Sequence, residues 1–151
     1  MRDMGQYPRF PLFIDLTGQK VVLVGGGNIA LRRTRTLLQF GAQVVVIAPT
    51  LHPDMPPVIH VGRPYRPGDL EGATLAVAAT DCRETNKQVA QEAKDRGIPV
   101  SVADDPRACT YFFPAVCVGE GLVAGVVGDA SDHARTARVA QQIRELMEDS
   151  I

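Results

Sequence analysis

The stretch KVVLVGGGNIALRRTRTLL, residues 20–38, decides the fold of this chain of 151 residues. Its first part, residues 21–24, is a run of β-branched and leucine residues, which is typical of a strand covered on both faces of a parallel sheet. From residue 28 onward, apolar residues recur at helical spacing among arginines, so we expect a helix over 28–39. The three consecutive glycines between these two segments therefore lie at a strand-to-helix turn.

The same alternation of strand and helix patterns continues along the chain. We expect five strands, at 20–25, 43–48, 58–61, 74–79 and 98–103. We also expect a second helix at 83–96 and a short turn of helix around 67–71. Such alternation predicts an α/β fold, a Rossmann-type doubly wound parallel sheet with helices on both faces. Gly41 and Gly97 follow the two helices, where a left-handed residue commonly ends a helix.

The character of the sequence changes after residue 110. The stretch YFFPAVCVGEGLVAGVV predicts two apolar strands around a Gly119-Glu120-Gly121 turn, and a helix is expected over 134–148. That helix carries an apolar stripe of Val139, Ile143, Leu146 and Met147. We expect residues 116–151 to form a short β-hairpin plus helix that makes a homodimer, with packing of the stripe on the chain's own sheet as the alternative.

Composition and charge exclude several classes of protein. With 45% hydrophobic residues and a formal net charge of −1, the chain lacks the clustered positive charge of a nucleic-acid-binding protein. Three cysteines without a CxxC pair argue against a disulfide framework or a structural zinc site. No stretch approaches the ~20 apolar residues of a membrane span. We expect a soluble, cytoplasmic protein with no membrane or nucleic-acid partner.

The glycine turn has the pattern of a dinucleotide-binding loop. Residues 25–30 match G-x-G-x-x-G/A, follow a strand and open a helix, so the cofactor's pyrophosphate is expected at the helix N-terminus. The alternative is a purely structural tight turn. No acidic residue that would hold a ribose hydroxyl follows the second strand, and no lysine or arginine occurs between Ala48 and Pro57, so NAD is favoured over NADP. The motif makes six residues candidates for cofactor binding: Gly25, Gly26, Gly27, Asn28, Ile29 and Ala30. Pro49 and Thr80 are added as residues at the ends of neighbouring strands, beyond which ligands of such sheets collect.

One strand end carries a candidate catalytic residue. Ligands of doubly wound sheets bind beyond the carboxyl ends of the strands, and of those ends only Asp104 supplies an ionised side chain. A carboxylate beside a cofactor crevice is a candidate general base or substrate anchor, the alternative being a helix- or turn-capping aspartate. Its neighbour Asp105 precedes Pro106 and is expected to shape a turn.

These motifs together resemble one enzyme family. The stretches FPLFIDLTGQKVVLVGGGNIALRRTRTLLQFGAQVVVIAP and LAVAATDCRETNKQVAQEAKDRGIPVSVADDPRACTYFFPA are similar to the N-terminal part of siroheme synthases and to free-standing precorrin-2 dehydrogenases, over about residues 8–127. The resemblance implies an NAD-binding domain over residues 1–115 and NAD-dependent oxidation of precorrin-2 to sirohydrochlorin. It matches Asp104 to the aspartate implicated in dehydrogenation and, in bifunctional members, in iron insertion.

The implied substrate is a tetrapyrrole polycarboxylate, which cationic side chains would orient. Candidates for carboxylate binding are Arg32, Arg33, Arg35 and Arg107, although arginines on a helix commonly form only a solvated face. Two departures from the family pattern concern substrate handling. Where relatives have a turn of the S-x-G-G-x-S-P kind, this chain has VVGDASDHARTAR, which puts substrate handling near residues 128–135 in question. The further helical module of relatives is not found before residue 151, so we expect either that a partner protein completes the site or that the activity is reduced.

No metal site is predicted. Asp129, Asp132 and His133 lie close in sequence, but three such residues in a loop do not define a closed coordination set, and Ser131 or Asp132 is expected to cap the last helix. The dehydrogenase prediction has two alternatives: a non-catalytic NAD- or tetrapyrrole-binding module, and a chelatase without dehydrogenase activity.

Overall fold

The computed structural model describes residues 8–129 and 131–149. Their contacts divide the chain into two compact units. One unit, here called the sheet unit, comprises Ile14–Tyr111. The other, here called the tail unit, comprises the described residues before 14 and after 111. The domain boundary expected after residue 115 falls a few residues beyond this division.

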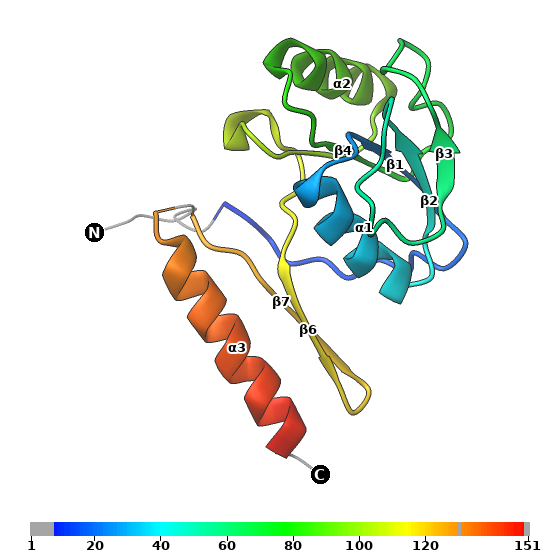
Figure 1. The fold of residues 1–151 in the computed structure, drawn as a ribbon. Helices are drawn as coiled ribbons and strands as arrows, with labels where there is room; N and C mark the ends of the chain where they lie inside the picture. Colours follow the sequence, from blue (N-terminus) through cyan, green and yellow to red (C-terminus); the bar gives the residue numbers. More distant parts are fainter. Residues whose placement is uncertain (1–7, 130, 150–151) are drawn as a thin grey trace. The chain divides into compact units, whose positions relative to one another are not determined.

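The sheet unit is built on five parallel strands (Figure 1). The strands are β1 (Lys20–Val24), β2 (Gln43–Ile47), β3 (Ile59–Val61), β4 (Leu75–Ala78) and β5 (Val100–Val102). Their order in the sheet is β3-β2-β1-β4-β5, so the chain reverses its direction of winding between β1 and β4. This order confirms the predicted α/β, doubly wound fold, whose ligand crevice lies at the carboxyl ends of the strands where the winding reverses.

Two helices cover the opposite faces of this sheet. Helix α1 (Asn28–Gln39) packs against β1 and β2, and helix α2 (Arg83–Arg96) packs against β4 and β5. Successive side chains of β1 point to opposite faces. Val22 and Val24 lie in the cluster that contains Val89 and Ala93 of α2, while Val21 and Leu23, also fully buried, point to the other face. The double burial explains the continuous apolar run in the sequence.

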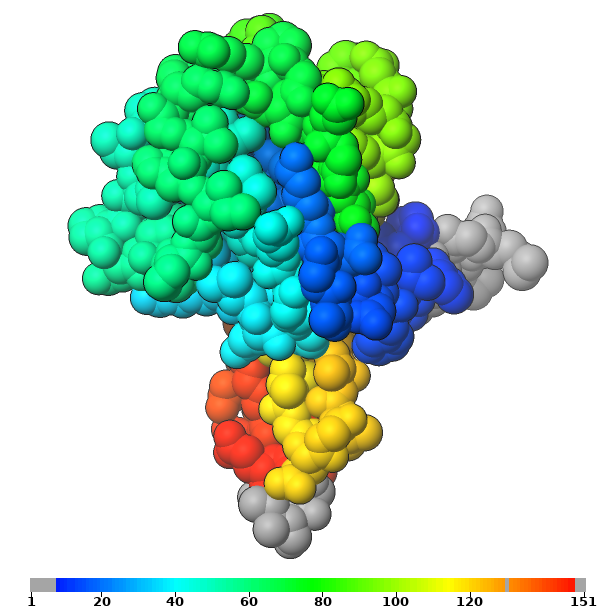
Figure 2. Space-filling model, turned by 90° about the vertical axis from the view of Figure 1, so that its right-hand side faces the viewer, coloured from blue at the N-terminus to red at the C-terminus, as the bar shows by residue number. Residues whose placement is uncertain are grey.

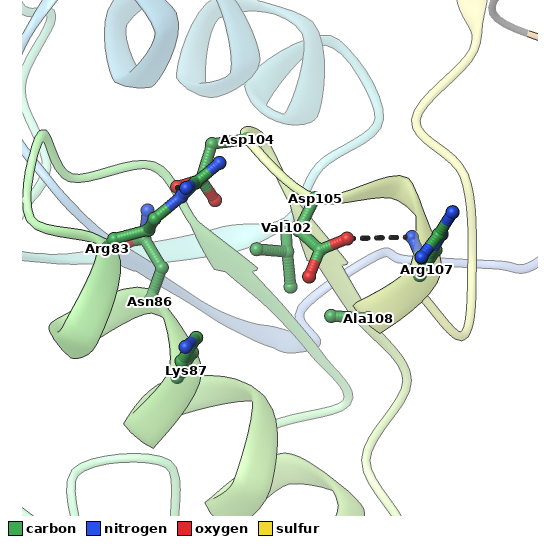
Figure 3. A pocket seen from close by; sticks show the side chains of 8 residues that line it. All are labelled: Arg83, Asn86, Lys87, Val102, Asp104, Asp105, Arg107 and Ala108. Carbon is green, nitrogen blue, oxygen red and sulfur yellow. Dashed lines mark hydrogen bonds and ion pairs between the residues drawn. The ribbon is translucent and has the colours of Figure 1, made fainter.

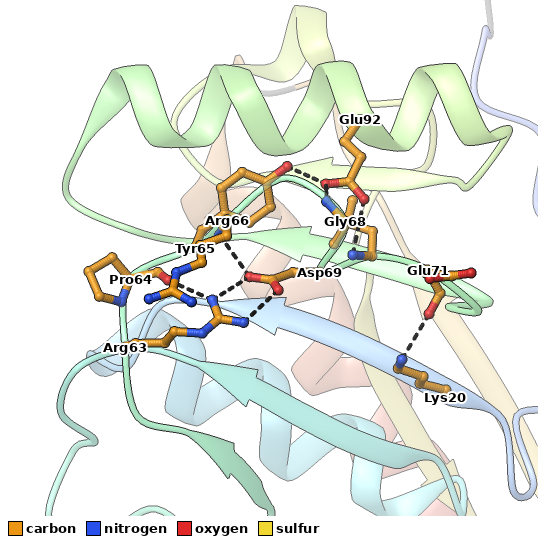
Figure 4. A network of polar contacts seen from close by, with 10 residues as sticks. Lys20, Arg63, Pro64, Tyr65, Arg66, Gly68, Asp69, Glu71 and Glu92 are labelled. Carbon is orange, nitrogen blue, oxygen red and sulfur yellow. Dashed lines mark hydrogen bonds and ion pairs between the residues drawn. The ribbon is translucent and has the colours of Figure 1, made fainter.

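The connection from β3 to β4 contains no helix, so the short helix expected around 67–71 is wrong. Side chains bind the backbone N–H groups that a helix would use (Figure 4). The Glu92 carboxylate of α2 accepts hydrogen bonds from the N–H groups of Gly68 (2.9 Å) and Leu70 (3.1 Å) and from the hydroxyl of Tyr65. Asp69 accepts from the backbone N–H of Arg66 at 2.8 Å and from Arg63. The segment is therefore a set of turns fastened to α2.

The charged groups of this connection are held in their ionised state. Burial raises the pKa of Glu92, but hydrogen bonds from Tyr65, Gly68, Leu70 and Arg96 outweigh it and leave the pKa below its ordinary value. The hydrogen bond from Arg63 likewise holds the pKa of Asp69 low. Both carboxylates therefore stabilise the fold in their charged form.

The tail unit contains the predicted hairpin and helix. Strands β6 (Ala115–Gly119) and β7 (Leu122–Val126) pair antiparallel through a two-residue turn, in which Glu120 and Gly121 both have positive φ, 52° and 78°. Such a turn matches the twist of the two strands. Helix α3 (His133–Asp149) lies beside the hairpin (Figure 2). The carboxylate of Asp132 accepts a hydrogen bond from the N–H of Arg135 at 2.9 Å, so Asp132 caps α3 as expected.

The apolar stripe of α3 is divided between two environments. Ala140 and Met147 are buried together with Cys117 of β6, and Ile143 packs against the same cluster. Leu146, in contrast, is 71% exposed. The hairpin also exposes Val118, Leu122 and Val123. Part of the stripe thus packs on the chain's own hairpin, and part of the unit's apolar surface remains in contact with solvent.

Within residues 8–129 and 131–149, none of the helices has the length and apolar character needed to cross a membrane.

Candidate functional site

The first glycine of the turn is required by the close approach of the chain after β4. Gly25 has φ of 127°, a region that side chains rarely adopt, and a Cβ added to it would overlap the carbonyl oxygen of Ala79. Its N–H donates to the carbonyl of Ile47 at 2.9 Å, while the N–H of Ala79 donates to the carbonyl of Val24 at 2.8 Å. Gly25 therefore joins the carboxyl ends of β1, β2 and β4 at one point.

The second glycine makes a similar approach on the other side. A Cβ on Gly26 would overlap the carbonyl oxygen of Thr50 and lie 3.0 Å from the Cβ of Ala48. The carbonyl of Gly26 also accepts a hydrogen bond from the N–H of His52 at 2.7 Å. The residues that follow β2, including the exposed Pro49, are thereby fixed against the turn. Two of the three glycines consequently serve the fold itself.

The third glycine faces open space. Gly27 is exposed, and a Cβ added to it would meet no atom within 4 Å among the described residues. It is the N-cap of α1, and no side chain caps that helix. The following Asn28 and Ile29 are exposed, while Ala30 is fully buried. The backbone N–H groups of the first turn of α1 therefore point to a free surface, as a pyrophosphate site requires.

Thr80, at the carboxyl end of β4, is held by a buried side chain of α2. Oδ1 of Asn86 accepts hydrogen bonds from the Thr80 N–H (3.1 Å) and hydroxyl (2.6 Å), and Nδ2 of Asn86 donates to the Thr80 carbonyl (3.1 Å). Asn86 is only 1% exposed. Because Ala79 is the residue that Gly25 approaches, Asn86 fixes the whole edge from the glycine turn to the start of α2.

Asp104 lies beyond β5 in a hollow of about 330 Å³ (Figure 3). Its carboxylate is 3.8 Å from Nε of Arg83, and its side chain is 35% exposed. Asp105 does not point freely into this space, since its carboxylate accepts a hydrogen bond from the N–H of Arg107 at 3.1 Å and caps a short 3-10 turn, Pro106–Ala108. The eight lining residues come from α2 and from 102–108: Arg83, Asn86, Lys87, Val102, Asp104, Asp105, Arg107 and Ala108.

The four candidate arginines occupy different environments. Arg107 lines the hollow that contains Asp104. Arg32 and Arg35 are exposed on α1. Arg33 is half-buried on the same helix, where burial and the neighbouring charge of Arg32 lower the pKa of its guanidinium. The hollow thus brings together Asp104 and Arg107 among the residues singled out from the sequence.

Sequence reasoning did not assign a role to three residues of this edge. Arg83 and Lys87 lie one turn apart at the start of α2 and line the hollow, and Asn86 fastens Thr80. A signal was available for the pair, because residues four apart on a helix share one face and these two directly follow a strand end. Asn86 follows the A-A-T-D motif and is one of the residues that carry the family resemblance, but its role appears only in the fold, where it is buried.

A dinucleotide fits the residues at this edge. The open space at Gly27 and the uncapped N-terminus of α1 leave the room and the N–H groups that a pyrophosphate needs, while Gly25 and Gly26 pack the turn against the neighbouring strand ends. Val24, Ile47 and Ala78 pair side by side at the ends of β1, β2 and β4, which places the residues that follow them along a single edge.

Comparisons with known proteins agree with the interpretation of the sheet as a dinucleotide-binding fold. A family model described as "Putative NAD(P)-binding" matches residues 12–115. A probable multifunctional siroheme biosynthesis protein, HemA of Ruminiclostridium josui, is 44% identical over 147 residues, which are 93% of this chain and 28% of that protein. A siroheme synthase of Stutzerimonas stutzeri is 41% identical over 136 residues, which are 85% of this chain and 29% of that protein. The chain thus spans less than a third of the length of these relatives.

A solved structure shares the fold. SirC, a precorrin-2 dehydrogenase, superposes with a TM-score of 0.76 at 26% sequence identity, covering 91% of this chain and 70% of that one. The resemblance read from the sequence, to siroheme synthases and precorrin-2 dehydrogenases, is therefore confirmed. With two thirds of its residues matched by the family model, the chain belongs to the putative NAD(P)-binding family.

Proposed function

We propose that this protein is an NAD-dependent dehydrogenase that oxidises precorrin-2 to sirohydrochlorin. The observation that carries the proposal is the position of Asp104, in a hollow lined by cationic side chains at the carboxyl end of β5, on the same sheet edge as the open glycine turn. The similarity to SirC and to siroheme synthases supports the choice of substrate. Doubly wound sheets bind cofactor and substrate at this edge.

The cofactor proposed is NAD rather than NADP. A 2′-phosphate requires a cation near the end of β2, and residues 48–57 contain neither lysine nor arginine. The residues proposed to contact the cofactor are those of the glycine turn together with Pro49 and Thr80. Gly27 and the first turn of α1 would hold the pyrophosphate, while Thr80, fixed by Asn86, would lie toward the nicotinamide end.

The reaction removes two hydrogens from the substrate, one with its electron pair and one as a proton. The nicotinamide, when bound, supplies the acceptor for the hydride. Asp104 is proposed to take up the proton on its carboxylate, as a general base. Nε of Arg83 lies 3.8 Å from this carboxylate and would hold it in place. Arg32, Arg33, Arg35 and Arg107 remain the candidates for binding the carboxylate arms of the substrate.

Substitution of Asp104 tests its role. Asp104→Asn keeps the size of the side chain and its hydrogen-bonding capacity but removes its basicity. General-base loss typically lowers a rate by about 10²–10⁴, so kcat with precorrin-2 should fall by that factor while NAD affinity is unchanged. The assay follows the absorbance of NADH and sirohydrochlorin under anaerobic conditions.

Asp105→Asn is the matched control, because its carboxylate is engaged with the N–H of Arg107. Its effect on kcat should be far smaller. Full activity of Asp104→Asn would remove the proposed base. Equal losses from both substitutions would instead indicate that the Asp-Asp-Pro turn is needed only for structure.

We further propose that the tail unit forms a homodimer, with residues 116–151 as the dimerisation element, and that the protein works in the cytoplasm. Leu146, Val118 and Leu122 are 71%, 56% and 58% exposed. A second copy of the same surface would bury them around a two-fold axis. The three cysteines are all free, and Cys82 is exposed, which suits a reducing compartment.

A further inference from the structure

The hollow beside Asp104 has an excess of positive charge that the proposed base does not explain. Its lining contains three cations, Arg83, Lys87 and Arg107, and two carboxylates, Asp104 and Asp105. Both carboxylates have partners. Asp104 forms an ion pair with Arg83, and Asp105 accepts a hydrogen bond from the backbone N–H of Arg107. Within the described part of the chain, the side chains of Lys87 and Arg107 form no ion pair.

Two of the three charged residues near the start of α2, Arg83 and Lys87, are cations, whereas Glu84 has the sign that a helix N-terminus favours. Arg83 is the first residue of α2 and Lys87 lies one turn later on the same face. Cations near a helix N-terminus are unfavourable because that end of the helix carries partial positive charge, and like charges four residues apart repel each other. An anion bound beside Lys87 would offset its repulsion by the helix N-terminus and by Arg83.

Lys87 and Arg107 lie on different sides of the hollow. Figure 3 shows Lys87 on α2 on one side and Arg107, in the 3-10 turn Pro106–Ala108, on the other, with Asp105 between them. The volume of about 330 Å³ lies at the lower end of the ~300–1,000 Å³ of small-molecule sites. It suits one carboxylate-bearing edge of a macrocycle rather than the entire ring.

We propose that this hollow is a carboxylate subsite, in which Lys87 and Arg107 bind an acidic side arm of the substrate and so set the position of the ring over Asp104. The identification of the arm as part of a tetrapyrrole rests on the proposed function. Lys87 supplies a point charge, whereas Arg107 supplies a planar fork that suits a carboxylate. Arg83 stays paired with Asp104.

The test measures binding separately from turnover. The probe is uroporphyrin, a stable polycarboxylate tetrapyrrole, titrated by absorbance against the wild type, Lys87→Gln and Arg107→Gln. Because a hydrogen bond between charged groups is worth about tenfold in affinity, each substitution should weaken binding by about that factor. Lys87→Arg should restore it. Added salt should weaken wild-type binding more than that of either variant.

Lys94→Gln is the matched control, since Lys94 is exposed near the other end of α2 and does not line the hollow. It should bind uroporphyrin as the wild type does. All variants should keep wild-type NAD affinity and thermal stability, because Lys87 and Arg107 are exposed.

The outcomes separate this inference from the proposed function. Equal uroporphyrin binding by the wild type, Lys87→Gln and Arg107→Gln would overturn the subsite, even if precorrin-2 is oxidised. Absence of uroporphyrin binding by the wild type would overturn it as well. Weaker binding by both variants would support it, even if the wild type fails to oxidise precorrin-2 and the proposed function falls.

Discussion

The three glycines of the turn should respond differently to substitution, although they are consecutive in the sequence. Gly25→Ala places a Cβ onto the carbonyl oxygen of Ala79 at a φ of 127°. Strain of this backbone region costs about 1–3 kcal/mol, and the displacement of a packed neighbour costs a similar amount. We expect a loss of about 3 kcal/mol. At about 2–4 °C per kcal/mol for a chain of this size, Tm should fall by about 6–12 °C.

Gly27→Val should behave in the opposite way. The new side chain meets no protein atom within 4 Å, and the φ of −92° is accessible to any residue. The change in stability should not exceed about 1 kcal/mol, which is the usual range for an N-cap substitution. The side chain would, however, occupy the space through which a pyrophosphate approaches the first turn of α1. Overpacking of about 1–3 kcal/mol corresponds to a loss of NAD affinity of about 5- to 150-fold.

The assay combines thermal unfolding with calorimetric titration of NAD on the same preparations. Gly25→Ala should lose stability, and Gly27→Val should lose affinity with little change in Tm. NADP should bind the wild type more weakly than NAD. Unchanged NAD affinity in a folded Gly27→Val would refute the assignment of the turn to the cofactor. A Tm of Gly25→Ala equal to that of the wild type would refute the packing role of the first glycine.

Three further substitutions test other parts of the account. Because the pKa values of Asp69 and Glu92 are lowered in the folded state, their stabilisation is present above the unfolded values of about 4 and is lost as pH falls through the folded values. Glu92→Gln should therefore cost about 1–3 kcal/mol at pH 7 and flatten the fall of Tm between about pH 5 and 3; an unaltered acid profile would contradict the role of this carboxylate. Asn86→Ala removes the hydrogen bonds of Thr80 to α2 and leaves only those with Cys82, so stability and NAD affinity should fall together, and a loss of neither would show that the contact is dispensable. Leu146→Glu should shift the mass measured by light scattering at micromolar concentration from dimer to monomer, and a monomeric wild type would remove the dimer.

The fold of the sheet unit could be predicted from the sequence because its apolar runs coincide with the strands that are buried. Strands β1 and β2 read as continuous apolar runs, and both are buried on two faces. The turns at 67–72 could not be predicted in the same way. Their backbone N–H groups are satisfied by Glu92, which lies more than twenty residues further along the chain. Gly68 and Gly72, both with positive φ, end any helix that the local pattern favours.

The sequence predicts the candidate-site residues that lie at strand ends better than those that lie on the face of a helix. The positions of Gly27 and Asp104 follow directly from the parallel sheet. The spacing of Arg83 and Lys87 places both on one face of α2, but most charged residues of this helix are exposed, so the spacing alone does not show that this face lines a hollow. Asp105 was correctly predicted to shape a turn, since it precedes a proline and caps the turn that follows.

The most direct measurement of the central claim is a single turnover of precorrin-2 with the wild-type protein and NAD in the absence of oxygen. The account predicts that sirohydrochlorin and NADH appear together in equal amounts, and that omission of NAD abolishes both. If NAD binds at the glycine turn but no NADH forms from precorrin-2, the protein is a binding module and the proposed dehydrogenase activity is contradicted.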